Sequence, residues 1–473
     1  MIGHDPDRTY RAAVIGAGSG GLTVAIGLAT MGHHVALIEG GQIGGDCTNV
    51  GCIPSKALLH AAARGDDNPL TWTRSRRDHL AAEEDELIEH HPTIHLVRGW
   101  ARLTSRRAPH VVAVATPDGV SSVVRAEHVV IAGGSQPATL DIPGLDTSSI
   151  LTNEELFEEE TPPASITVIG GGAIGVEMAT ALASTGSKVD IVELRSHVLP
   201  DHDPLIAEVV ERSLAARGVS LHLGVAVESA DEASGALQLS DGSKIDAPDR
   251  VMIAIGRRAR LDGLDLDAAG VAYTAAGIGA DDWGRTNIDG IWALGDVTGN
   301  TLTTHGAGAT GRRAVRAIAF PYAPKLARRR AVPAAVFGSP EVASVGLSLD
   351  ELAEWDPAGR RRIVVDYADI DRGFTDDIDD GRLVLDVQRF NGKILRAAIV
   401  GRAAADMIGL FTMAIDNGLG LRTLFPMVHP YPSHAEIVRE AADRFAAETL
   451  NNIPTELSAA VRSRVRRTLR RKR

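Results

Sequence analysis

The sequence predicts an α/β protein with two Rossmann-like dinucleotide-binding domains and a C-terminal α+β domain. Two glycine-rich stretches, each set between predicted strands and followed by a helix and an acidic residue, indicate the two nucleotide folds. From Ala331 onward, short strands alternate with helices, which indicates the third domain. A chain of 473 residues is long enough for about three domains.

The first glycine-rich unit spans residues 10–39, with a buried strand at 10–15, a glycine loop, a helix and a strand that ends in an acid. Its motif residues are Gly16, Gly18, Gly21 and Glu39. The first glycine permits a tight turn, the second lets the backbone approach a pyrophosphate, and the third lets the helix pack on the strand. The terminal carboxylate can accept hydrogen bonds from ribose hydroxyls.

The second unit spans residues 166–193 and repeats this pattern. Its motif residues are Gly170, Gly172, Gly175 and Glu193. Two such folds imply two bound dinucleotides; the alternative is a duplicated scaffold that binds one. Three further strands are predicted at 129–137, 251–258 and 286–299, and each leads into a glycine turn.

Composition excludes several classes of protein. A net charge of −12 argues against nucleic acid as the main partner. No apolar run reaches the ~18 residues that a membrane helix needs. The N-terminal stretch has no apolar signal core, so we expect a cytoplasmic protein.

Cys47 and Cys52 are the only cysteines, and both lie in the stretch GGDCTNVGCIPSK. Two cysteines cannot form the disulfide framework of a chain this long. A structural zinc site needs four ligands, and no tight histidine cluster lies nearby, so we expect no resident metal. A close pair in a reducing compartment indicates redox chemistry.

GGDCTNVGCIPSK resembles the redox-active helix of the flavoprotein disulfide reductases, the class I pyridine nucleotide-disulfide oxidoreductases. The stretches ALGD (293–296), VFGSPEVASVGLS (336–348) and HPYPSHAE (429–436) follow in the order typical of that family, so the resemblance covers residues 10–447. It implies FAD in the first unit, a nicotinamide dinucleotide in the second, and a homodimer formed by the C-terminal domain.

The domains that this resemblance implies are a first FAD-binding part at 1–150, an NAD(P)-binding domain at 151–271, a second FAD-binding part at 272–330, a dimerisation domain at 331–450 and a basic tail at 451–473. The tail contains eight Arg or Lys between 462 and 473. It would contact an anionic partner or a membrane surface, or stay a solvated tail.

The resemblance also assigns roles to single residues. The nicotinamide would reduce FAD, which would reduce the Cys47–Cys52 disulfide. Cys52 would face the flavin as the charge-transfer thiolate, and Cys47 would meet the substrate. Both would lie at the start of a helix, whose N-terminus favours the thiolate form. Lys56 would lie near the flavin N5 and pair with Glu177.

In the same way, Asp296 would bind the ribityl chain of the flavin, and a helix that begins near Thr304 would point its N-terminus at the pyrimidine ring. The full set of expected cofactor-binding residues is Gly16, Gly18, Gly21, Glu39, Gly133, Gly295, Asp296, Thr304, Gly170, Gly172, Gly175, Glu193 and Gly256. Glu193 would repel a 2′-phosphate, and Leu194 stands where NADPH-using relatives often carry a basic residue; Arg195 is adjacent. We therefore predict NADH as coenzyme, with NADPH as the alternative.

The C-terminal motif departs from the family pattern. Dihydrolipoamide dehydrogenase and glutathione reductase carry a catalytic histidine where this chain has Tyr431, whereas Glu436 keeps its spacing. A phenol with a pKa near 10 cannot act as a base at pH 7. His429 or His434 is the alternative base. Tyrosine at this position resembles mercuric reductase, but the C-terminal cysteine pair of that enzyme is missing here.

Asp46 is a second departure, because relatives commonly have threonine there. We expect its carboxylate to raise the pKa of Cys47 by like-charge repulsion and to make this thiol less reactive toward ordinary disulfides.

These features predict an NAD(P)H oxidoreductase that passes electrons through FAD and the Cys47–Cys52 pair to a small acceptor. The acceptor would be a metal ion, a thiol-bound species or an unusual disulfide, and Tyr431 and Glu436 would complete the partner subunit's active site. The alternatives are dihydrolipoamide dehydrogenase, a flavin-only diaphorase, and a redox-sensing or partner-binding flavoprotein.

Overall fold

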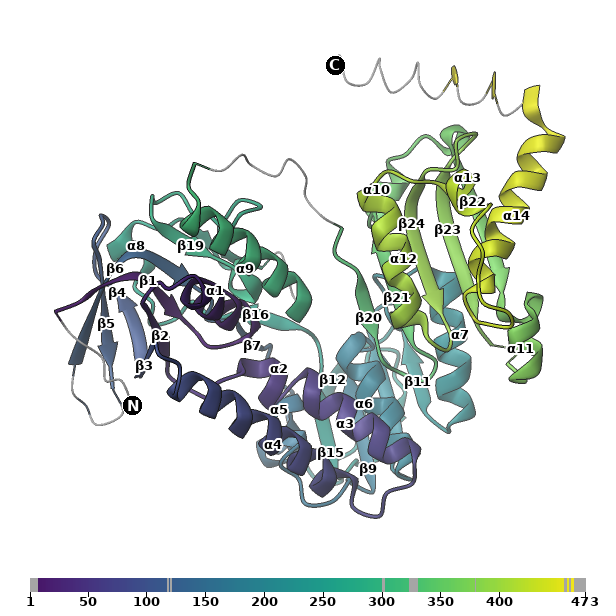
Figure 1. Ribbon diagram of the computed structural model, residues 1–473. Coiled ribbons are helices and arrows are strands. Elements are labelled where there is room, and N and C mark those ends of the chain that lie inside the picture. The colour runs from purple at the N-terminus through teal and green to yellow at the C-terminus, as the bar shows by residue number, and fades with distance from the viewer. Residues whose placement is uncertain are drawn as a thin grey trace. The chain divides into compact units, whose positions relative to one another are not determined.

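The computed structural model describes most of the chain as two compact units (Figure 1). The described residues are 7–116, 119, 121–299, 303–322, 331–378, 380–454, 457–458 and 461–462. The first unit comprises residues 1–141, 150–162 and 252–329, and the second comprises residues 142–149, 163–251 and 330–473. The predicted domain boundaries remain a prediction, and residues 463–473 of the basic tail lie outside the described residues.

A mostly parallel sheet forms the centre of the first unit, in the order β3-β2-β1-β6-β5-β4, with β19 beside β6. The parallel strands are β1 (Thr9–Ile15), β2 (Val35–Glu39), β3 (Ile94–Arg98), β6 (Ser121–Ile131) and β19 (Ile291–Ala293). The antiparallel strands are β4 (Trp100–Leu103) and β5 (His110–Ala115). The helices of this unit are α1 (Ser19–Thr30), α2 (Gly45–Asn49), α3 (Cys52–Ala63), α4 (Pro69–Glu89), α5 (Asn153–Leu156), α8 (Leu266–Ala269) and α9 (Thr304–Ala319).

Alternate residues of β1 face two separate apolar cores, as the period of two in a strand requires. Ala12 and Val14 pack with residues of α1 and α9, whereas Ala13 and Ile15 pack with residues of β5 and β19. Both faces of the sheet are therefore covered, which is typical of a parallel sheet.

Helices α1 and α9 lie side by side on the first of these faces (Figure 1). Glycine makes their close approach possible: a Cβ atom on Gly27 would lie 2.9 Å from Cγ2 of Val315. Gly16, Gly18 and Gly21 lead into α1, so this contact fixes the loop that the sequence predicts to bind FAD against α9.

Smaller elements connect these parts. They are β7 (Ser135–Pro137), which pairs antiparallel with β16 (Arg257–Ala259), the hairpin of β17 (Tyr273–Thr274) and β18 (Gly277–Ile278), and the short strands β8 (Ile150–Leu151) and β15 (Arg250–Ile253). The strand predicted at 129–137 is thus divided between the end of β6 and β7. Two glycines after Ala132 separate the pieces.

The second unit contains the second βαβ pattern, with β9 (Ser165–Ile169), α6 (Ala173–Ser184), β10 (Lys188–Glu193), α7 (Pro204–Ala216) and β11 (Ser220–Leu223). Its strands pair in parallel in the order β11-β10-β9. A small antiparallel sheet follows, made of β12 (Val227–Ala230), β13 (Leu237–Leu239) and β14 (Lys244–Ile245).

The C-terminal part of this unit is an antiparallel sheet with helices, in the order β20-β21-β24-β23-β22. Its strands are β20 (Ala334–Val336), β21 (Val342–Gly346), β22 (Arg360–Asp366), β23 (Arg382–Gln388) and β24 (Ile394–Val400). Its helices are α10 (Leu349–Ala353), α11 (Asp371–Thr375), α12 (Ala404–Asp416), α13 (Leu421–Leu424) and α14 (Glu436–Asn451). One core joins the sheet to α12, α13 and α14. The predicted fold class is confirmed.

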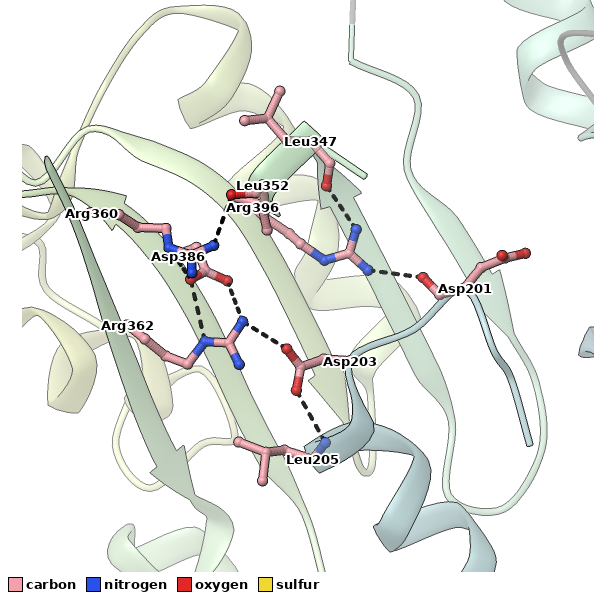
Figure 2. Close-up of polar contacts among 9 residues, drawn as sticks. All are labelled: Asp201, Asp203, Leu205, Leu347, Leu352, Arg360, Arg362, Asp386 and Arg396. Atoms are coloured by element: carbon pink, nitrogen blue, oxygen red, sulfur yellow. Dashed lines mark hydrogen bonds and ion pairs between the residues drawn. The ribbon is translucent and has the colours of Figure 1, made fainter. Parts of the chain in front are cut away.

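Buried charges connect the other face of this sheet to the N-terminus of α7 (Figure 2). Asp386 accepts hydrogen bonds from Nε and Nη2 of Arg362, at 3.3 and 3.0 Å, and Arg360 Nε lies 3.6 Å from the same carboxylate. Arg362 also lies 2.9 Å from Asp203, whose other oxygen caps α7 by accepting from Leu205 N at 3.1 Å. Both carboxylates are 1% exposed, so each depends on its arginine partner.

Arg396 extends this contact beside His202. It donates to the carbonyl oxygens of Leu347 and Asp201, at 2.8 and 3.3 Å (Figure 2). Burial, and then the charge of Arg396, lower the pKa of His202 to about 4. Nδ1 of His202 has no hydrogen-bond partner among the described residues. A proton on this ring would be poorly solvated in the folded state.

No helix in the described part of the chain is long and apolar enough to cross a membrane.

We expect His202 to make the protein less stable as the pH falls from about 6.5 to 4. In this window the unfolded chain binds a proton that the folded chain does not, so stability present above pH 6.5 is lost. The difference corresponds to roughly 3 kcal/mol at most. The melting temperature of His202→Gln should fall less steeply with decreasing pH than that of wild type. His79→Gln, at a side chain that is 70% exposed, is the matched control and should follow wild type. Equal slopes for all three proteins would contradict the prediction.

Candidate functional site

The two cysteines lie on two consecutive helices. Cys47 is inside α2, and Cys52 is the first residue of α3. Gly51 makes the turn between them: a Cβ atom there would lie 2.7 Å from the carbonyl oxygen of Asp46. The sequence predicted that both cysteines lie at the start of one helix. Because of this turn, only Cys52 lies at the N-terminus of α3. The favourable effect of a helix N-terminus on a thiolate therefore applies to Cys52.

The side chains of Cys47 and Cys52 contact each other and Thr304. Both cysteines are free thiols in this structure. Sγ of Cys52 lies 3.3 Å from Oγ1 of Thr304, the first residue of α9. The hydrogen bond to Cys52, followed by burial, raises the pKa of Cys47, and Thr304 opposes this shift. The arrangement favours the thiolate on Cys52 and a protonated thiol on Cys47.

Asp46 does not act as the sequence suggested. Its carboxylate forms an ion pair with Nη2 of Arg257, and Asp46 is not among the causes that raise the pKa of Cys47. Cys52 and burial, rather than the expected repulsion by Asp46, are the causes of the raised pKa of Cys47.

Arg257 also reaches a second carboxylate through a serine. Nε of Arg257 donates to Oγ of Ser135 at 2.8 Å, and that hydroxyl donates to Oδ2 of Asp296 at 2.7 Å. Burial raises the pKa of Asp296, while the hydrogen bond from Ser135 and the charge of Arg257 oppose the shift. One guanidinium thus pairs directly with the acid next to Cys47 and is linked through Ser135 to the acid expected at the flavin.

The glycine loops leave room for a phosphate group at the starts of α1 and α6. Gly18 and Gly172 are the N-cap residues and have no side chain to cap the free N–H groups. A Cβ atom on Gly172 would meet nothing within 4 Å, and one on Gly18 only a glycine Cα at 3.8 Å. Uncapped N–H groups at an open helix N-terminus fit a pyrophosphate. These loops would hold FAD in the first unit and the nicotinamide dinucleotide in the second.

The terminal acids of both units bind their own glycine loops. Glu39 accepts from the N–H groups of Ala17 and Gly41, both at 2.6 Å. Glu193 accepts from Gly171 at 2.7 Å and from Arg195 at 2.8 Å. A carboxylate has about four acceptor sites, so each acid keeps capacity for ribose hydroxyls.

We expect Glu193→Gln to weaken NADH binding about tenfold and to leave the FAD content unchanged. An amide cannot accept at both ends, and losing one charge-assisted hydrogen bond costs about 1.5–3 kcal/mol. Glu39→Gln is the matched variant, and it should lower the FAD content while sparing NADH binding. Titration calorimetry gives the NADH affinity, and visible absorbance gives the FAD content. If both variants disturbed the same cofactor, the assignment of one dinucleotide to each unit would fail.

The other expected cofactor residues lie at strand and helix ends. Gly133 follows β6, Gly256 (φ +120°) precedes β16, and Gly295 (φ +73°) starts a 3₁₀ turn that contains Asp296. The helix expected near Thr304 begins at that residue. The cofactor roles of these residues remain predictions.

Lys56 and Glu177 belong to different units. Lys56 lies on α3 and donates to Oγ of Ser55 at 3.2 Å. Glu177 lies on α6, is 6% exposed and accepts from the N–H of Phe337 at 2.9 Å. Their pairing remains a prediction.

Tyr431 is 72% exposed, and its hydroxyl donates to Oδ2 of Asp371 at 3.0 Å. This hydrogen bond and the charge of Asp371 raise the pKa of Tyr431, so the phenol stays protonated at neutral pH. Burial lowers the pKa of both His429 and His434. Both rings are therefore neutral at pH 7, and each is a weaker base than an ordinary imidazole.

Glu436 begins α14 and is 4% exposed. Arg439, one turn along the same helix, lies 3.7 Å from its carboxylate. The partner subunit's active site, which Tyr431 and Glu436 are expected to complete, remains a prediction.

Sequence reasoning did not select Ser135, Arg257 or Asp371 as site residues. Ser135 and Arg257 lie in the predicted strand-turn segments GGSQP and GRR, so their positions beside glycine turns were a usable signal. Nothing in the sequence indicated that either contacts Asp46 or Asp296. In the described residues, no group of three or more His, Cys, Asp or Glu is placed to hold a metal ion.

Two nucleotide folds, a thiol pair at a helix start and an antiparallel C-terminal sheet define a flavin-dependent dithiol oxidoreductase. The family described as pyridine nucleotide-disulphide oxidoreductase matches residues 10–311, and its dimerisation domain matches residues 332–442. The chain belongs to this family of flavoprotein disulfide oxidoreductases, whose members use FAD and NAD(P)H. The dimerisation domain supports a homodimer.

Relatives with known names cover nearly the whole chain. Dihydrolipoyl dehydrogenase of Chlorobaculum tepidum is 34% identical over 92% of this chain and 96% of its own length. The enzyme of the same name from Pseudomonas aeruginosa is 30% identical over 93% and 98%. The Cu(II) complex of the HOCl-induced flavoprotein disulfide reductase RclA from Escherichia coli is similar in structure, with a TM-score of 0.84, 29% identity and coverage of 92% and 99%.

Proposed function

We propose that this enzyme passes electrons from NAD(P)H through FAD and the Cys47–Cys52 pair to a small acceptor, with a metal ion as the favoured acceptor class. The observation that carries the proposal is the contact of Cys47, Cys52 and Thr304 at the start of α9. When bound, FAD would take a hydride from the nicotinamide and supply two electrons to the cysteines.

The cysteines would store those electrons as a thiolate on Cys52 and a thiol on Cys47. The N-terminus of α3 stabilises a negative charge on Cys52, and its hydrogen bond with Thr304 keeps the sulfur in place. Cys47, which carries the raised pKa, would hold the proton. Reoxidation of this thiol–thiolate pair to the disulfide would release two electrons and the one proton held by Cys47.

Tyr431 supports a metal ion rather than a dithiol as the partner of this reaction. A dithiol substrate needs a base to remove its proton, and a phenol that donates to Asp371 cannot serve at neutral pH. A metal ion needs no proton removal: two Cu(II) ions would each take one electron from the dithiol. The RclA structure with Cu(II) bound is a precedent among structural relatives of similar length. Tyrosine here also resembles mercuric reductase, as the sequence indicated.

Dihydrolipoyl dehydrogenase is the second candidate. The curated relatives quoted above carry this name and are 30–34% identical over more than 90% of the chain. This candidate requires His429 or His434 to replace the missing base.

Anaerobic titration with NADH tests whether the cysteines exchange electrons with FAD. We expect wild type to take up about two reducing-equivalent pairs per FAD, one for the flavin and one for the disulfide. A long-wavelength absorbance band should appear as the Cys52 thiolate forms. Cys47→Ser should take up about one pair. Uptake of one pair by wild type would show idle cysteines and would favour a flavin-only diaphorase; negligible uptake would favour a redox-sensing or partner-binding role.

Replacing Tyr431 tests the choice of acceptor. We expect Tyr431→His to raise turnover with dihydrolipoamide and NAD at least about tenfold, since a positioned general base contributes about 10²–10⁴ to rate. Tyr431→Phe is the matched control and should gain nothing. The measurement is steady-state NADH formation, beside NADH-dependent Cu(II) reduction by the same proteins. Fast lipoamide turnover by wild type that Tyr431→His leaves unchanged would identify dihydrolipoyl dehydrogenase instead.

A further inference from the structure

Three acids and one arginine surround the helix that carries Cys47. Asp46 precedes Cys47 in α2, and Arg257 on β16 pairs with it. The Arg257 side chain is 14% exposed and the Asp46 side chain 39%, so solvent screens this pair only partly. Asp296 is connected to the same guanidinium through Ser135. Burial, followed by the charge of Asp46, raises the pKa of Glu154, and Arg257 opposes that shift.

Among these four residues, the three acids outnumber the one arginine. Asp46 acts on both Glu154 and Asp296, and Arg257 acts on all three acids; Glu155 and Arg260 also act on Glu154. At Cys47 itself, the hydrogen bond with Cys52, burial and the charge of Cys52 raise the pKa of the thiol, and the hydrogen bond with Thr304 opposes this shift. Arg257 thus supplies the positive charge that the position of Asp46 requires.

We propose that Arg257 is a positioning residue for the cysteine pair: by holding the carboxylate of Asp46, it cancels that negative charge beside Cys47 and keeps Cys47 reactive. The inference rests on the proposed function, because it takes Cys47 as the thiol that meets the acceptor. It explains how an aspartate can stand beside this thiol without suppressing it.

The geometry requires a guanidinium rather than any neutral side chain. Nη2 of Arg257 pairs with Asp46 and donates to the carbonyl oxygen of Ser135 at 3.2 Å, while Nε donates to the hydroxyl of Ser135. The planar fork therefore fixes the carboxylate of Asp46 against the β7–β16 pair. Loss of Arg257 would leave the charge of Asp46 uncompensated.

Alkylation of Cys47 by iodoacetamide tests this directly and needs no electron acceptor. The assay uses the FAD-loaded protein in a Cys52→Ser background, where Cys47 is the one remaining sulfhydryl. Mass spectrometry follows the rate from pH 5 to 10. Because the thiolate is the nucleophile, the rate at pH 7 reports how charge near Cys47 affects the thiol.

The two single variants should move this rate in opposite directions. Arg257→Met leaves Asp46 uncompensated and should slow alkylation at pH 7 about fivefold, with the midpoint of the pH profile moved upward. Asp46→Asn removes the negative charge next to Cys47 while Arg257 remains, and it should speed alkylation by a similar factor, with the midpoint moved downward. The double variant should return close to the parent rate.

Arg257→Lys keeps the positive charge without the planar fork, so it should slow alkylation less than Arg257→Met does. Changes of the same sign in both single variants, or no recovery in the double variant, would show a purely structural contact and overturn the proposal. If Arg257→Met does not retain FAD, the test rests on Asp46→Asn, for which faster alkylation is expected. An unchanged alkylation rate in Asp46→Asn would then overturn the proposal. The NADH titration is a separate test: the charge effect can hold where electron transfer to the cysteines fails.

Discussion

The close approach of backbone to backbone at Gly51 is the constraint on which the redox site depends. The turn there ends α2, starts α3 and brings the two thiols into contact. Any Cβ at this position would press on the carbonyl oxygen of Asp46. A five-residue separation along one continuous helix would instead place the two sulfurs on different faces. The same turn places Cys52 at the N-terminus of α3, whereas Cys47 is the thiol with the raised pKa.

Several carboxylates in this protein hold loops and helices in place through hydrogen bonds and ion pairs within the chain. Glu39 and Glu193 each accept from two N–H groups, one in the glycine loop next to its first glycine and one just past the strand that the acid ends. Asp203 and Asp386 hold α7 to the C-terminal sheet through Arg362. In each case a buried or half-buried acid is satisfied by several donors, which is the condition for keeping its charge away from water.

Much of this architecture could be predicted from the sequence, because its signals are local. Glycine spacing, strand length and a terminal acid lie within 30 residues of each other, so both βαβ units were predicted from the residues. The start of α9 was implied by the family resemblance. The break at Gly51 was missed because glycine inside a helical stretch is compatible with either outcome. The pairing of Asp46 with Arg257 was missed because 211 residues separate the partners, and no periodic pattern relates them. The prediction that the Asp46 carboxylate would repel the Cys47 thiolate therefore took no account of this ion pair.

The packing of α1 against α9 has a consequence for how the chain folds during synthesis. The first apolar core needs β19 and α9, which are made only after the whole stretch from 163 to 251 has left the ribosome. Until then α1 exposes the face that contains Gly27, and the C-terminal end of β6, at 129–131, lacks the neighbour that β19 provides. Contacts of such long sequence separation form slowly, because the intervening loop must first be closed. The inserted stretch can order its own parallel strands in that interval, so the later nucleotide fold is able to mature before the earlier one.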